Sequence, residues 1–258
     1  MVNIHKIKRW PMKKYSLGFI SDQDLFNHVK ETAEKYRFCV SLDAFKKNLP
    51  DPIKLTFDAK IYGKDVKDII ENEILRQIDK SNTNHIGYFH QNIFKYINSD
   101  WKIPAHGFDV VNTKAKVFVE MKNKHNTMNS SSSQKTYMRM LFTIQQDPKA
   151  TCMLVEVIAK HSQDIPWVTS LDGHTVKTPN IRRVSIDKFY EKVTGDKSAF
   201  KKLCEILPAV IDDVVQSSKE NLVAHTVFQE LEAISPDILK SIYLISFKEY
   251  EGFKHFSI

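Results

Sequence analysis

The stretch GFDVVNTKAKVFVEMK (107–122) shows where the chain forms a sheet. It holds two short runs rich in β-branched and aromatic residues, GFDVV and KVFVEMK, joined by the residues 112–115. Two such runs around a short connection are typical of an antiparallel β-hairpin. We therefore expect residues of the two runs to lie side by side in this hairpin.

Three charged residues meet on the predicted hairpin. Side chains alternate along a strand, so Glu120 and Lys122 project from one face, and Val119 and Met121 from the other. The partner strand brings Asp109 beside Glu120, and two neighbouring carboxylates repel each other unless a cation bridges them. Mg²⁺ fits such a site, because it binds one or two carboxylates together with waters and a substrate phosphate. In this interpretation Lys122 acts on an attacking water; an ordinary cross-strand ion pair is the alternative.

Helices and strands alternate on both sides of the hairpin. The run TCMLVEVIA (151–159) is almost continuously apolar, which is typical of a central strand covered on both faces. A stretch punctuated by glycine and proline follows at 164–180. Helices are expected at 21–37, capped by Ser21 or Asp22, and at 64–80, 86–97, 132–146, 187–194 and 197–217, with a short strand at 182–186 and mainly helix in the last forty residues.

This order of elements predicts an α/β or α+β fold. We expect a mixed central β-sheet flanked by helices, with mainly helical N- and C-terminal parts. One core can serve a chain of this length, so a single domain over 1–258, with a catalytic core at about 64–160, is the simplest expectation.

Composition excludes several classes of protein. The chain has the hydrophobic and charged content of a globular protein, and no stretch reaches the ~20 apolar residues of a membrane span. Its seven glycines and three cysteines are too scattered for a nucleotide-binding loop or a structural zinc site. The absence of an apolar signal-peptide run favours the cytoplasm. A net charge of +7 favours a polyanionic partner.

The expected helix at 64–80 carries a carboxylate within its apolar stripe. The stripe runs from Val66 to Ile74 at helical spacing, and Glu73 falls inside it. A carboxylate in such a position needs a partner. We expect Glu73 to support the metal site as a catalytic residue, with an ion pair to a lysine or arginine as the alternative.

A basic segment follows the hairpin. Residues 121–140 contain three lysines, one arginine and no acidic residue, so the surface suits DNA phosphates. A helix that begins near Ser132 offers its N-terminus to a phosphate oxygen. A polar loop without this role is the alternative. The DNA-binding residues expected here are Asn123, Lys124, His125, Asn126, Asn129, Gln134 and Lys135.

The pattern of Asp109 followed by Glu120-Met121-Lys122 resembles the active site of the PD-(D/E)xK nuclease superfamily. The longer strings GFDVVN (107–112), SNTNHIGYFHQNIFKYI (81–97) and VEMKNKHNTMNSSSSQKTY (119–137) resemble type II restriction endonucleases that cut GGNCC sites. The chain departs from the superfamily at Phe108, which stands where proline is usual. That position is not a metal ligand, so the departure puts little in doubt.

The resemblance implies a Mg²⁺-dependent enzyme that cleaves both strands of DNA and leaves 5′-phosphate ends. The implied metal positions are Asp109, Glu120 and Met121. It also implies a homodimer on a pseudo-palindromic site in a bacterial cytoplasm, together with a cognate DNA methyltransferase that protects the host's own sites. The apolar C-terminal residues, including Leu231, Ile238 and Ile242, are candidates for the dimer interface or for the core.

Reading G·C pairs requires donors to guanine O6 and N7, which arginine supplies best. Arg182 and Arg183 are the candidates. Neighbours on a strand point to opposite faces, so we expect at most one of them to read a base, and solvated surface charge is the alternative. Two other functions stay open: a DNA-repair or junction-resolving nuclease with the same core, and a DNA-binding protein without catalysis.

Overall fold

The computed structural model describes residues 14–217 and 226–247. These residues divide into two compact units. The first unit joins the described residues up to 34 to those from 86 to 217, and the second joins 35–85 to 226–247. Each unit has its own hydrophobic core. The single domain expected over the whole chain stays a prediction.

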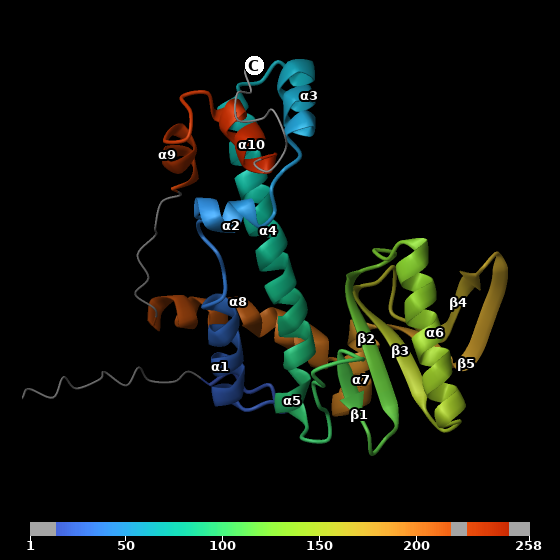
Figure 1. Cartoon of the computed structure of the whole chain (residues 1–258). Coiled ribbons are helices and arrows are strands. Elements are labelled where there is room, and N and C mark those ends of the chain that lie inside the picture. Colours follow the sequence, from blue (N-terminus) through green and yellow to red (C-terminus); the bar gives the residue numbers. More distant parts are fainter. Residues whose placement is uncertain (1–13, 218–225, 248–258) are drawn as a thin grey trace, which may run out of the picture. The chain divides into compact units, whose positions relative to one another are not determined.

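A five-stranded mixed sheet forms the centre of the first unit (Figure 1), in the order β1-β2-β3-β5-β4. Its strands are β1 (Val110–Asn112), β2 (Val117–Lys124), β3 (Thr151–Ile158), β4 (Asp164–Leu171) and β5 (His174–Ser185). The predicted hairpin is confirmed as β1 and β2, which are antiparallel with Val110 opposite Val119. Strand β3 pairs in parallel with β2 and β5, so the continuously apolar run is central, as predicted.

The stretch punctuated by glycine and proline, 164–180, is mostly strand, because β4 and β5 form a second antiparallel hairpin. Its turn is Asp172-Gly173, where φ is 47° and 85°. Two consecutive positive φ angles make the two-residue turn that Asp-Gly favours between strands. Pro166 is tolerated because β4 is an edge strand, where the missing N–H breaks no central ladder. The sequence analysis assigned no element to this stretch, and the Asp-Gly pair was the available signal for its turn.

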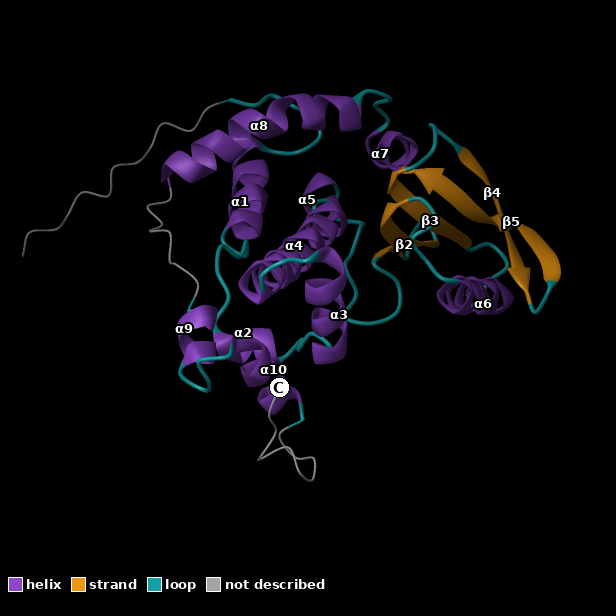
Figure 2. Ribbon diagram, turned by 90° about the horizontal axis from the view of Figure 1, so that it is seen from above, coloured by secondary structure: helices purple, strands orange, loops and turns teal. Residues whose placement is uncertain are grey.

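Different helices cover the two faces of the sheet. Helix α6 (Ser130–Gln146) lies along one face (Figure 2), where its Tyr137 and Met140 are buried with Leu154 of β3. On the other face Val119 and Met121 belong to a larger cluster. That cluster draws on α1 (Asp22–Ala33), α5 (Phe94–Ile97), α7 (Ile186–Thr194) and α8 (Ala199–Ser217). Because side chains alternate along β2, Glu120 faces α6.

One long helix, α4 (Val66–Asn92), stands where two were expected at 64–80 and 86–97. The polar residues between them contain no proline, so nothing forces the helix to end. Asn82 bonds the backbone N–H and C=O of Arg37 with its side chain, at 2.8 and 3.1 Å, and does not compete with its own helix. The first expected helix does begin at the cap Ser21, but it ends at Ala33.

The second unit is helical. It contains α2 (Leu42–Lys46), α3 (Pro52–Tyr62), the first part of α4, α9 (Val227–Glu232) and α10 (Ile238–Ser246). Leu231 and Ile242 are fully buried and Ile238 is 5% exposed, all in one cluster with Phe45 and Ile70. These C-terminal residues are therefore core, which is the second of the two roles that the sequence left open for them. None of the helices described is both long and apolar enough to span a bilayer.

Candidate active site

The β1–β2 hairpin brings the predicted carboxylates together. The N–H of Asp109 donates to the carbonyl of Val119 at 2.9 Å. One carboxylate oxygen of Asp109 accepts a hydrogen bond from the N–H of Met121 at 2.7 Å. Glu120 lies between Val119 and Met121 on β2, so the pairing of the hairpin places the side chains of Asp109 and Glu120 side by side.

The carboxyl group of Asp109 is held where its charge is unfavourable. Burial raises the pKa of Asp109 above its ordinary value of 3.8, and the neighbouring charge of Glu120 raises it further. The N–H of Met121 and the cations of Lys122 and Arg139 oppose this shift without cancelling it. Two close carboxylates whose charge is incompletely compensated suit a bound cation.

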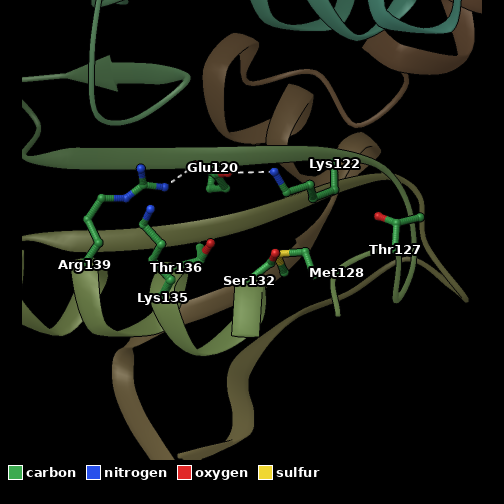
Figure 3. Close-up of a pocket in the computed structure, with 8 residues that line it drawn as sticks. All are labelled: Glu120, Lys122, Thr127, Met128, Ser132, Lys135, Thr136 and Arg139. Atoms are coloured by element: carbon green, nitrogen blue, oxygen red, sulfur yellow. Dashed lines mark hydrogen bonds and ion pairs between the residues drawn. The ribbon is translucent and has the colours of Figure 1, made fainter. Parts of the chain in front are cut away.

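Each carboxylate oxygen of Glu120 has a cationic partner. The side chain of Glu120 is 11% exposed, and Lys122 Nζ lies 2.7 Å from one oxygen. The guanidinium of Arg139, from α6, donates to the other oxygen. Figure 3 shows the two cations reaching Glu120 from opposite sides. The site thus contains two acidic and two basic side chains.

Arg139 is the site residue that the sequence interpretation missed. It was noticed only as one of four basic residues in a segment without acids. A helical pattern on α6 was the available signal, because Arg139 lies three residues after the buried Thr136 and next to the buried Met140. That spacing places it on the side of the helix that faces the sheet.

A hollow of about 480 Å³ opens between β2 and α6 (Figure 3). Its lining combines one carboxylate with three cations and three hydroxyl groups, a set that suits an anionic phosphate. The lining residues are Glu120, Lys122, Thr127, Met128, Ser132, Lys135, Thr136 and Arg139. The predicted catalytic lysine and the predicted DNA-binding residue Lys135 therefore border the same space.

A second ionic cluster lies next to the site, because Lys122 is opposite Glu156 in the β2–β3 register. The Glu156 side chain is 2% exposed and accepts two hydrogen bonds from Arg183, at 2.5 and 3.0 Å. His125 Nδ1 lies 2.9 Å from it, and Arg183 also donates to Asn126 at 2.8 Å. Burial alone would raise the pKa of Glu156, but the bonds from Arg183 and His125 lower it below 4.5.

The two candidate base-reading arginines point to opposite faces, as predicted. Arg182 lies opposite Met153 and Arg183 opposite Leu154, and these two belong to the clusters on the two faces of the sheet. Arg182 forms an ion pair with Asp164 at 2.7 Å. Each arginine thus has a carboxylate partner already. Base reading by either one stays a prediction.

The other predicted DNA-binding residues lie between the end of β2 and the first turns of α6. Asn129 caps α6, because its side chain accepts from the N–H of Ser132 at 2.8 Å. Exposed residues in this segment are Lys124, Asn126, Asn129 and Lys135, and half-buried ones are Asn123, His125 and Gln134. The segment is accessible enough for DNA, and the contacts themselves stay predictions.

Glu73 lies on α4 in the second unit. It forms an ion pair with Arg76 at 2.5 Å and accepts a hydrogen bond from Gln77 at 3.0 Å. Burial would raise the pKa of Glu73, but these partners lower it. The pairing is the alternative that the sequence left open, and a role of Glu73 at the metal stays a prediction.

The donors of the hairpin fit a divalent cation. No group of three or more His, Cys, Asp or Glu side chains converges within residues 14–217 and 226–247. Mg²⁺ needs fewer protein ligands, and Asp109 and Glu120 supply two carboxylates. The Met121 side chain is buried on the opposite face, but its N–H points to Asp109. The N–H and C=O of one strand residue point the same way, so its carbonyl is the group that Met121 can offer.

Comparison with known proteins assigns the chain to a family. The sequence profile of the Eco47II restriction endonuclease family matches residues 17–216. The chain belongs to this family. The type II restriction enzyme Sau96I of Staphylococcus aureus is 31% identical over 215 residues, which are 79% of this chain and 82% of that enzyme. The type II restriction enzyme Eco47II of Escherichia coli is 28% identical over 214 residues, which are 77% of this chain and 88% of that enzyme.

The chain is therefore a type II restriction endonuclease, a site-specific deoxyribonuclease that acts on double-stranded DNA. Enzymes of this class generally use divalent metal ions. The matched residues include the whole β1–β2 hairpin, α6 and the strand that carries Arg183. The predicted restriction endonuclease is confirmed over the two alternative functions.

Proposed function

We propose that this restriction endonuclease cuts GGNCC sites with Mg²⁺ held by Asp109 and Glu120, and leaves 5′-phosphate ends. The buried carboxylate pair beside Lys122, at the edge of a hollow lined with cations and hydroxyls, carries the proposal. The recognition sequence and the end type rest on the resemblance in the hairpin and its flanking strings.

Different groups of the hairpin have different roles in hydrolysis. A bound Mg²⁺ neutralises charge on the scissile phosphate and makes an attacking water more acidic. Asp109 and Glu120 hold the metal, and the carbonyl of Met121 offers a further oxygen. Lys122 borders the hollow, so its ammonium group orients the water and stabilises the negative charge that develops. Glu73 is a further candidate for support of the metal site.

The segment after β2 binds the DNA backbone in this proposal. Lys124 and Lys135 are exposed cations, and Asn123, Asn126 and Asn129 supply neutral donors. His125 and Gln134 are the other two residues of this segment that we expect to contact DNA. Arg182 and Arg183 are the candidates for guanine contacts, which would require each guanidinium to share or leave its present carboxylate partner.

A pseudo-palindromic site presents the same contacts twice, so we propose that two copies bind it with twofold symmetry. Each copy then places one Asp109, Glu120 and Lys122 set against one strand. A cognate DNA methyltransferase protects the host's sites. Both enzymes act where the chromosome is, in the bacterial cytoplasm.

Substitution of Lys122 tests the assignment of the active site. We expect Lys122→Ala to reduce cleavage of a GGNCC duplex by at least about 100-fold, because stabilisation of transition-state charge is lost. Binding to the same duplex in Ca²⁺ should stay within threefold, because Lys122 acts on the reaction more than on the ground state. Lys114→Ala is the matched control, because Lys114 lies in the hairpin connection and its side chain is 82% exposed. Cleavage by Lys122→Ala within tenfold of the parent enzyme would refute the assignment.

A further inference from the structure

Arg139 joins the two arms of the active-site hairpin from a third element, α6. Its guanidinium donates to Glu120 on β2 and to the carbonyl of Gly107, two residues before Asp109, at 2.7 Å. It also lies over the ring of Phe108, 4.8 Å from the ring centre. One side chain thus contacts both segments that carry the carboxylates.

Both carboxylate oxygens of Glu120 already have a cationic partner. Lys122 and Arg139 each bind one of its two oxygens. Lys122 and Arg139 are thus both paired with Glu120, whereas the charge of Asp109 is only partly compensated. A divalent cation bound to Glu120 has to take an oxygen from one of them, and its two charges then repel the cation that it displaced.

The guanidinium of Arg139 is incompletely satisfied in its present position. Its Nε is buried and has no hydrogen-bond partner among the described residues, so its present position does not satisfy all of its donors. Its side chain is 36% exposed and borders the hollow that also contains Lys135 and the Ser132 hydroxyl. A guanidinium that turned into this hollow would meet a DNA phosphate, the anion that it binds best through paired N–H groups.

We propose that Arg139 is the built-in counter-ion of Glu120, released by the metal so that its guanidinium binds the DNA phosphate. This inference rests on the proposed metal site. Two consequences distinguish it from a purely structural role of Arg139 in holding α6 to the hairpin. Metal and Arg139 compete for Glu120 in the absence of DNA, and metal and DNA phosphate strengthen each other's binding.

Metal titration without DNA tests the competition. Mn²⁺, which binds the same oxygen ligands as Mg²⁺, is titrated calorimetrically into the parent enzyme, Arg139→Met and Lys135→Met. Lys135 is one helical turn away and lines the same hollow, but it is not ion-paired with Glu120 (Figure 3). We expect Arg139→Met to bind Mn²⁺ about three- to tenfold more tightly, because a partly buried competitor is gone, and Lys135→Met to change the affinity less than twofold.

A second measurement uses the unaltered enzyme and so does not depend on the folding of a variant. Phenylglyoxal modifies free guanidinium groups, and mass spectrometry of peptides gives the rate at each arginine. We expect Mn²⁺ to accelerate modification of Arg139 at least threefold. Modification of Arg182, which is paired with Asp164, is the internal control and should not change.

The outcomes separate this proposal from the one on which it rests. Failure of the parent enzyme to bind Mn²⁺ would overturn the metal site itself. The role of Arg139 alone would be overturned if Arg139→Met left Mn²⁺ binding unchanged or weakened it. It would also be overturned if Mn²⁺ did not change the rate of modification at Arg139.

Discussion

The buried pair of Glu156 and Arg183 leads to a prediction about stability. Glu156→Gln keeps the shape and one acceptor oxygen, but it removes the charge that holds Arg183 and His125. Removing one partner of a buried ion pair costs about 3–5 kcal/mol. The Glu156 side chain is 2% exposed but Arg183 is 17% exposed, so water compensates part of the loss and we expect about 2–3 kcal/mol. For a unit of this size that corresponds to a fall in Tm of roughly 5–10 °C.

A double-mutant cycle isolates the pair. Arg183→Gln alone leaves the buried Glu156 with His125 but without its guanidinium partner, and it should cost at least as much as Glu156→Gln. The double variant leaves no uncompensated charge, so its loss should be smaller than the sum of the single losses by about 1–3 kcal/mol. Urea unfolding followed by circular dichroism measures all four free energies. Single losses that simply add would refute the argument that the two side chains stabilise the fold as a pair.

The same pair has a predictable dependence on pH. The pKa of Glu156 is lowered in the folded protein, so its contribution is fully present above the ordinary value of 4.5 and is lost as the pH falls through the lowered pKa. The difference in unfolding free energy between the parent and Glu156→Gln should therefore be largest near neutral pH and shrink below about pH 4.5. A difference that grows on acidification would contradict the sign of the shift.

Three further predictions concern the active site and the assembly. Asp109→Asn should raise the Tm of the metal-free enzyme at pH 7 while abolishing cleavage, because burial and Glu120 raise the pKa of Asp109 above 3.8 and its charge is disfavoured in the fold. This gain should vanish as the pH falls through the raised pKa, and a lower Tm at pH 7 would contradict it. Glu73→Gln should weaken the Mg²⁺ dependence of cleavage without unfolding the protein, whereas an unchanged Mg²⁺ titration would leave Glu73 with only its ion pair to Arg76. A mixed dimer with one Lys122→Ala subunit should nick a supercoiled plasmid and not linearise it, and sedimentation that finds one protein chain per DNA site would exclude the dimer.

Local patterns made the hairpin and its charged face predictable. Asp109, Glu120 and Lys122 lie close in sequence, and strand alternation alone places the last two on one face. The hairpin pairing then supplies the first. Each step uses contacts over a few residues, which a single sequence shows directly.

The missed features depend on contacts between distant segments. Arg139 reaches Glu120 only because α6 docks on the sheet with one particular side inward. The helical spacing places Arg139 on that side, but a local pattern does not give the partner that it meets there. Glu156 looked like part of an apolar strand, and its partner Arg183 comes from a strand 27 residues later. The continuous α4 was missed for the opposite reason, since polar side chains such as Asn82 bond a distant backbone and leave the helix intact.

The two edges of the sheet restrict how copies of this protein can associate. Edge strand β4 carries Pro166, and its ladder with β5 is interrupted between Pro166 and Val168, so a strand from another molecule would find a missing N–H and an irregular backbone. At the opposite edge β1 has only three residues, and Val111 exchanges both of its backbone hydrogen bonds with Lys102. Each edge is thus open to another strand over only part of its length. If two subunits bind one DNA site as proposed, we therefore expect them to meet through side chains and not through one continuous ladder of their sheets.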